Sequence, residues 1–101
     1  MMDADPLALS GGDVPYLPRG VRLQDDRVRG IRVLQAPERA MQLDMIGDAI
    51  LSELDGTITL DALIARLASK YAAPTDEIAA DVREFLRGLI ERRMVFVRGR
   101  K

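Results

Sequence analysis

The 101-residue chain contains no cysteine and no histidine. The missing cysteine excludes disulfides, thiolate zinc sites and thiol nucleophiles. The missing histidine removes the side chain that most often serves as a general base or a metal ligand. Lysine is scarce too, because Lys70 and Lys101 are the only two. The carboxylates lie where they suit helix ends and solvated faces, so we expect no catalysis, no metal site and no cofactor.

Charge of one sign and long apolar runs are also lacking. Fifteen basic residues face 16 acidic ones, for a net charge of -1, which gives no reason to expect a polyanionic partner. No apolar run approaches the ~20 residues of a membrane span, and the first residues lack the basic start of a signal peptide. We therefore expect a cytoplasmic protein with no membrane contact.

The length suffices for one domain with a modest core. Residues 1–15 contain two prolines and two adjacent glycines, so we expect a flexible N-terminal segment there. We place the folded domain at residues 16–97 and a short basic tail at residues 98–101. Inside the domain the polar and apolar pattern changes after Asp44 from a strand period to a helix period, and a short extended exit is expected at Met94–Val97.

Three short strands come first in the expected order. Val21–Gln24 alternates apolar and polar residues, as does a second segment at Val28–Gln35. Pro37 ends the second strand because proline cannot donate to a strand ladder. Arg39–Leu43 is the third strand. Short turns join all three, which indicates an antiparallel sheet.

Three helices follow the strands. Asp44 is a suitable N-cap for the first, Thr59 for the second, and Pro74 with Thr75 begins the third and longest. The third helix carries an apolar stripe that includes Ile78, Val82, Phe85, Leu86 and Leu89. The fold class predicted is α+β, a winged helix-turn-helix-like domain in which an N-terminal three-stranded antiparallel β-sheet precedes three α-helices.

A helix-turn-helix raises the alternative of a winged-helix DNA-binding regulator. The leading half of the third helix would then enter the major groove. That half carries four acidic residues against two arginines, namely Asp76, Glu77, Asp81 and Glu84 against Arg83 and Arg87. Because affinity for DNA depends on neutralising phosphates, we expect no nucleic-acid binding.

The third strand should lie at an edge of the small sheet, where its backbone groups would be free to pair with another chain. One interpretation is that its shortness protects the edge and nothing binds. The other is strand addition, in which a peptide pairs with the edge and its side chains enter a groove beside it. The third helix would be the wall of that groove. A further alternative is a subunit that docks on an enzyme without a peptide site.

The chain resembles the PqqD family of pyrroloquinoline quinone (PQQ) biosynthesis and its wider class of RiPP recognition elements. The similarity covers about Leu17 to Val95. It is carried by short motifs at the entry, before the third strand, in the first helix and in the third helix. These are Pro18, Arg19, Gly20 and Val21; Ala36, Pro37, Glu38 and Arg39; Gly47, Ala49, Ile50 and Leu51; Asp55 and Gly56; Asp81, Val82, Phe85, Leu86 and Leu89.

The resemblance implies a non-catalytic peptide chaperone. PqqD-like proteins bind the precursor peptide PqqA and present it to the radical SAM enzyme PqqE, which cross-links a Glu and a Tyr of the peptide. In related recognition elements the peptide adds to the third strand and packs on the third helix. The peptide-binding residues implied here are Arg39, Ala40, Met41, Gln42, Leu43, Val82, Arg83, Phe85, Leu86 and Leu89. Arg39 and Arg83 would pair with acidic peptide side chains. An exposed sheet edge can also self-pair, so we expect a monomer or a weak homodimer.

Overall fold

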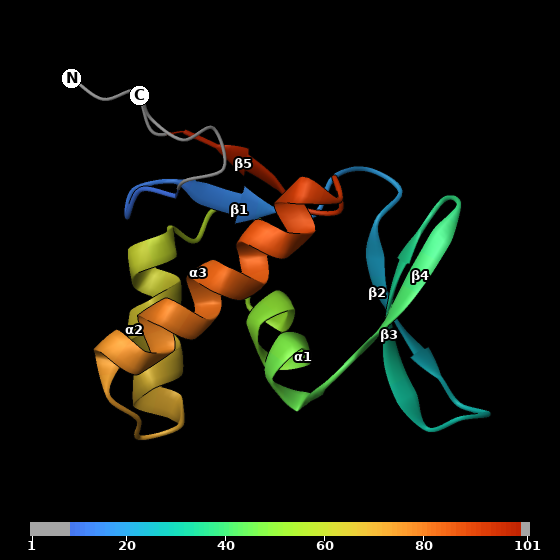
Figure 1. Ribbon diagram of the computed structural model, residues 1–101, viewed down its shortest axis with the longest axis horizontal. Coiled ribbons are helices and arrows are strands. Elements are labelled where there is room, and N and C mark those ends of the chain that lie inside the picture. Colours follow the sequence, from blue (N-terminus) through green and yellow to red (C-terminus); the bar gives the residue numbers. More distant parts are fainter. Residues whose placement is uncertain (1–8, 100–101) are drawn as a thin grey trace.

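The computed structural model describes residues 9–99 and shows an α+β fold with three helices and two antiparallel sheets (Figure 1). The elements follow in the order β1 (Val14–Tyr16), β2 (Arg22–Asp26), β3 (Ile31–Ala36), β4 (Arg39–Leu43), α1 (Met45–Ser52), α2 (Leu60–Lys70), α3 (Thr75–Glu91) and β5 (Phe96–Arg98). In Figure 1 the three-stranded sheet stands beside the helices, and β1 and β5 lie near the C-terminal end of α3.

The main sheet has the strand order β2-β3-β4. Leu23, Leu34 and Met41 lie opposite one another on neighbouring strands, so they share one face. Leu34 is fully buried on that face, which turns toward the helices. Arg32 lies on it too and donates to the carboxylate of Asp48 in α1 at 2.9 Å. This ion pair fastens the sheet to the first helix.

The three helices begin where the sequence predicts, and side-chain caps form at the first two. The Asp44 carboxylate accepts from the Gly47 N–H at 2.7 Å, and the Thr59 hydroxyl accepts from the Ala62 N–H at 3.2 Å. Pro74 is the N-cap residue of α3. The helices, the inner face of the sheet and both ends of the described chain enclose one core. Its largest fully buried side chains include Leu34, Ile50, Leu51, Leu60, Leu63, Leu86 and Met94.

Two sequence-based predictions about the strands are wrong. The second strand begins at Ile31 and not at Val28, because residues 27–30 form a turn that Gly30 closes with a left-handed φ of 71°. Val28 is 96% exposed at its tip. The three-stranded sheet is also not the first element, since β1 precedes it and pairs antiparallel with β5. The winged-helix description stays a prediction.

The flexible description does not fit residues 9–15. Leu9 is buried, and Val14–Tyr16 forms β1. The Asp13 carbonyl accepts from the Leu60 N–H at 2.8 Å, and the Gly11 carbonyl accepts from the Asp61 N–H at 3.0 Å. Burial of an apolar side chain and these hydrogen bonds hold the segment against α2. Residues 1–8 of the expected flexible segment and residues 100–101 of the expected tail lie outside the described residues, and the domain boundaries stay a prediction.

Candidate functional site

The strand β4 is an edge of the main sheet, as the sequence predicts. One side pairs with β3, with Met41 opposite Leu34 and Gln42 opposite Val33. Within residues 9–99 no strand pairs with the other side. Backbone groups of alternate β4 residues therefore point outward, where another strand can bond to them. Ala40 and Gln42 are exposed on the outer face, while Leu43 is buried on the inner face.

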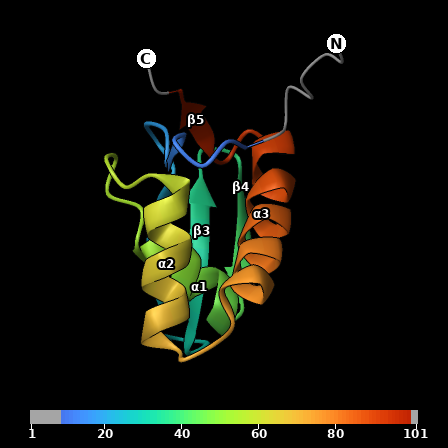
Figure 2. The same ribbon diagram turned by 90° about the vertical axis from the view of Figure 1, so that its left-hand side faces the viewer.

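A wall stands beside this edge, and its main side chain is Phe85 of α3. Phe85 is half-buried and lines a depression of about 390 Å³ together with residues 41–44. Figure 2 shows α3 standing next to β4 on this side of the molecule. The ring is held against α1, because a Cβ added at Gly47 would lie only 2.9 Å from the Phe85 Cζ atom. The absence of a side chain at Gly47 thus places the ring in the depression.

The other apolar residues predicted for the wall lie beneath it. Val82, Leu86 and Leu89 are 1%, 0% and 2% exposed, and they belong to the core. The helical period explains the difference, since these three side chains share a face that turns inward, and Phe85 lies at its border. Their role as direct peptide contacts stays a prediction, whereas Phe85 is the member of the set that lines the depression.

The two predicted arginines lie in different places. Arg39 donates to the Arg92 carbonyl at the end of α3, and the Arg92 side chain approaches the Met41 sulfur at 3.9 Å. Arg39 therefore lies at one end of the depression. Arg83 donates to the Leu9 carbonyl and lines the outer face of α3 with Glu84 and Arg87. The structure does not bring Arg83 to the β4 edge.

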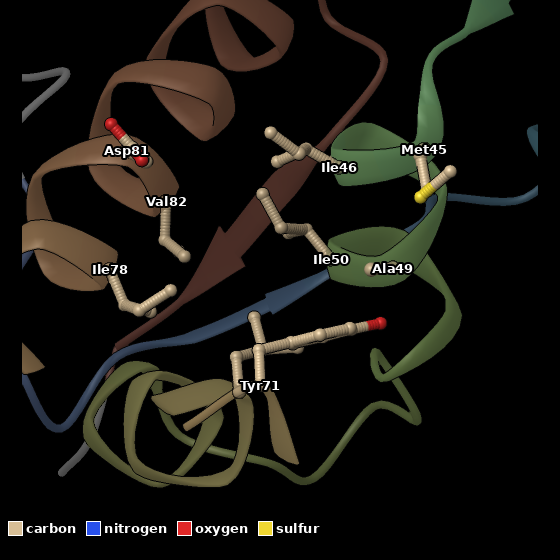
Figure 3. A pocket seen from close by; sticks show the side chains of 9 residues that line it. Met45, Ile46, Ala49, Ile50, Tyr71, Ile78, Asp81 and Val82 are labelled. Atoms are coloured by element: carbon tan, nitrogen blue, oxygen red, sulfur yellow. The ribbon is translucent and has the colours of Figure 1, made fainter. Parts of the chain in front are cut away.

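Two groups of residues near the edge were not predicted from the sequence. At the start of β4, Arg19 and Arg93 line one shallow hollow together with Glu38 and the predicted Arg39. Beyond the end of β4, Met45 and Ile46 line an apolar pocket between the three helices (Figure 3). The sequence did contain a sign of this pocket. Two apolar residues directly follow the Asp44 cap, and a helix places neighbouring residues on different faces, so both could not be buried on one face.

The described residues contain no group of three or more acidic, His or Cys side chains that could hold a metal ion. The charged groups with shifted pKa values among the described residues are Glu53, Arg32 and Asp55, which lie outside β4. Arg66, and then Lys70, hold the pKa of Glu53 below its ordinary value. The hydrogen bonds that Arg32 donates to Asp48 and then to Asp25 raise the pKa of Arg32. Glu53 and Arg32 each join one element to another, whereas hydrogen bonds from the Thr57 and Ile58 N–H groups lower the pKa of Asp55. Within residues 9–99 no helix is long and apolar enough to span a membrane.

Comparisons with known proteins place the chain in a family. The sequence matches the family model "Coenzyme PQQ synthesis protein D (PqqD)" over residues 32–95, which is more than half of the chain. The chain belongs to the PqqD family. The similarity of the motifs is therefore confirmed as a family relationship. One relative is the PqqA binding protein of Rhizobium meliloti, 52% identical over 93% of this chain and 96% of its own length.

Other PqqD relatives extend the comparison. The bifunctional coenzyme PQQ synthesis protein C/D of Methylorubrum extorquens is 45% identical over 91% of this chain, which spans 25% of that longer protein. The solution NMR structure of the PqqD truncation of Methylobacterium extorquens PqqCD, described as a stand-alone RiPP recognition element, superposes with a TM-score of 0.78. It shares 44% identity, with 90% of this chain and 97% of that chain covered. The Xanthomonas campestris PqqD crystal structure is 39% identical, with a TM-score of 0.54 over 86% of this chain and 97% of its own.

Proposed function

We propose that this protein is a non-catalytic chaperone of PQQ biosynthesis that binds the precursor peptide PqqA by strand addition to β4 and presents it to the radical SAM enzyme PqqE. The observation that carries the proposal is the open side of β4 next to Phe85. The name of the Rhizobium meliloti relative, a PqqA binding protein, supports the choice of peptide.

The interaction energies are adequate for a reversible complex. Three or four new backbone hydrogen bonds contribute about 0.5–1.5 kcal/mol each, net. Two apolar peptide side chains buried beside Phe85 add roughly 1.5–3 kcal/mol each. Ordering a flexible peptide removes part of this gain. A dissociation constant on the order of micromolar follows.

A titration of isotope-labelled protein with PqqA tests the site. We expect the amide resonances of residues 39–44 and those around Phe85 to shift, and those of residues 60–66 on α2 to stay. Shifts confined to α2 and β1 would contradict the assignment of the edge.

The variant Met41→Lys tests the same site by affinity. Met41 is half-buried and lies at the depression, so a cation there removes apolar contact with the peptide. We expect affinity for PqqA to fall about tenfold or more, measured by calorimetry. The matched control is Val28→Lys, because Val28 is 96% exposed at a distant turn. Undiminished binding by a folded Met41→Lys variant would reject strand addition at β4. Leu86 is unsuited to this test, since it is fully buried and a charge there would unfold the core.

Presentation to PqqE is the second part of the proposal. A ternary complex should form when the protein, PqqA and PqqE are mixed, and the cross-linking rate should fall when the protein is withheld. If the protein associates with PqqE equally well with and without PqqA, the alternative of a docking subunit is favoured. The DNA-binding alternative is not favoured, because the exposed leading half of α3 carries Asp76, Glu77, Asp81 and Glu84.

A further inference from the structure

The apolar pocket beyond the end of β4 has walls from all three helices. Ile46 and Ile50 of α1 face Ile78 and Val82 of α3, and Tyr71 closes one side (Figure 3). Met45, Ile46 and Tyr71 are 84%, 59% and 52% exposed, although residues of this size usually lie inside. Three large exposed apolar side chains gathered around one pocket make it a candidate binding surface.

The volume of the pocket limits the size of the group that can bind in it. Its volume is about 260 Å³. Sites for small molecules and cofactors usually measure about 300–1,000 Å³ and carry several convergent polar groups. This pocket has one charged lining residue, Asp81, among the residues that the structure describes. It therefore suits one or two bulky apolar side chains of a polypeptide better than a cofactor.

Asp81 places a negative charge at the rim of the pocket. It is exposed, and no ion pair to it is found within residues 9–99. A cation held beside an apolar wall is attracted by such a carboxylate over a few ångströms. The start of β4 has the opposite character, because Arg19, Arg39 and Arg93 line the hollow there. The surface is thus basic at one end of β4 and apolar with an acidic rim at the other.

The pocket continues the surface proposed for strand addition. Asp44 belongs to the β4 depression, and the next residue, Met45, already lines the pocket. Leu43 and Ile46 are three residues apart, so at most about 11 Å separates them along the chain. An extended peptide advances ~3.3 Å per residue. Two or three residues beyond the partner of Leu43 would reach the pocket.

We infer that the peptide bound at β4 places a bulky apolar side chain in the pocket of Met45, Ile46, Tyr71 and Ile78, just outside its strand-paired segment, and sets a Lys or Arg of the same peptide against Asp81. This inference rests on the proposed peptide binding at β4. It specifies the peptide class: an apolar anchor with a neighbouring cation next to the strand-forming segment.

Ile46→Glu and Met45→Glu test the anchor with synthetic PqqA as the probe. Both side chains are largely exposed, so the fold should persist. We expect either change to weaken PqqA binding about tenfold or more, because a charge replaces apolar contact. The matched control Val28→Glu should leave the affinity unchanged. Tight PqqA binding by wild type together with unaltered affinity of both pocket variants would overturn the inference and leave the proposed function intact. No PqqA binding by wild type would overturn the proposed function itself.

A methyl experiment gives a second readout that does not depend on variants. In protein labelled at the isoleucine methyl groups, bound PqqA should show NOEs to Ile46 and Ile78, and none to Ile31 on the outer face of the sheet. Shifts at the β4 amides without NOEs to Ile46 or Ile78 would again overturn only the pocket.

Asp81→Asn tests the cation. We expect a two- to fivefold loss of PqqA affinity at low salt. Each Lys or Arg of the peptide is also replaced in turn by Gln. One of these replacements should weaken binding to wild type and leave binding to the Asp81→Asn protein unchanged. If every replacement has the same effect on the affinity of wild type and of Asp81→Asn, Asp81 is removed from the inference. The pocket could instead hold a second copy of this chain, and sedimentation of wild type and of the Ile46→Glu protein tests this. If the variant loses a dimer that wild type forms and its affinity for PqqA is unchanged, the pocket is a dimer contact and the inference is overturned.

Discussion

At the scale of single residues, two helix ends adopt a left-handed backbone without glycine. Arg93 follows α3 with a φ of 61°, and Ala72 follows α2 with a φ of 51°. Both ends have the same hydrogen-bond pattern. The Arg93 N–H donates to the Ile90 carbonyl and the Met94 N–H to the Leu89 carbonyl. This is the Schellman motif, in which glycine is the favoured residue at the left-handed position.

Arg93→Gly should therefore stabilise the protein. Relief of the left-handed strain is worth about 1 kcal/mol, reduced by the greater freedom of glycine in the unfolded chain. We expect the free energy of unfolding in urea to rise by roughly 0.5–1 kcal/mol, and Ala72→Gly to act in the same direction. If both variants are less stable than wild type, backbone strain does not limit these helix ends.

At the scale of elements, one carboxylate joins the end of α1 to α2. The Glu53 oxygens accept from Arg66 Nη1 at 3.0 Å and from Lys70 Nζ at 3.5 Å. The Glu53 side chain is 16% exposed, so water screens these contacts only in part. The hydrogen bond from Arg66, followed by that from Lys70, lowers the pKa of Glu53. The charged form is therefore favoured in the folded protein.

This linkage predicts how stability changes with pH. Because the pKa of Glu53 is lowered on folding, its stabilisation is complete above the ordinary glutamate value of about 4.3 and is lost as the pH falls through the lower folded value. Glu53→Gln should make unfolding in urea less dependent on pH between pH 5 and pH 3. Glu84→Gln, at an exposed position on α3, serves as the matched control. Curves of identical slope for wild type and Glu53→Gln would contradict the role of this contact.

At the scale of the whole molecule, the two ends of the described chain close the core together. β1 pairs with β5, the Tyr16 ring meets the Phe96 ring edge-on at 6.2 Å, and the Arg98 guanidinium lies over Tyr16. Leu9 inserts into the same core, and its carbonyl accepts from Arg83. From Leu9 onward the segment before β2 thus packs against the same core as the helices.

Leu9→Ala tests whether that segment contributes to global stability. Leu9 is 8% exposed, and truncating a buried leucine typically costs about 2–5 kcal/mol, with the lower end expected near a chain end. We expect a loss of about 2 kcal/mol in the free energy of unfolding, measured in urea. Val28→Ala, at a fully exposed turn, should change it by less than ~0.5 kcal/mol. An unaltered Leu9→Ala protein would mean that the segment packs without stabilising the fold.

The sequence by itself determined the helices, the strand β4 and the family. Asp44, Thr59 and Pro74 mark helix starts because capping is a local interaction, and Pro37 marks the end of β3 for the same reason. Tertiary structure decided which side chains are buried and which elements contact one another. Val82, Leu86 and Leu89 went into the core, Arg83 turned to Leu9, and Val14–Tyr16 became a strand. Period and composition describe one element at a time, whereas burial of a side chain depends on partners that are distant in the sequence.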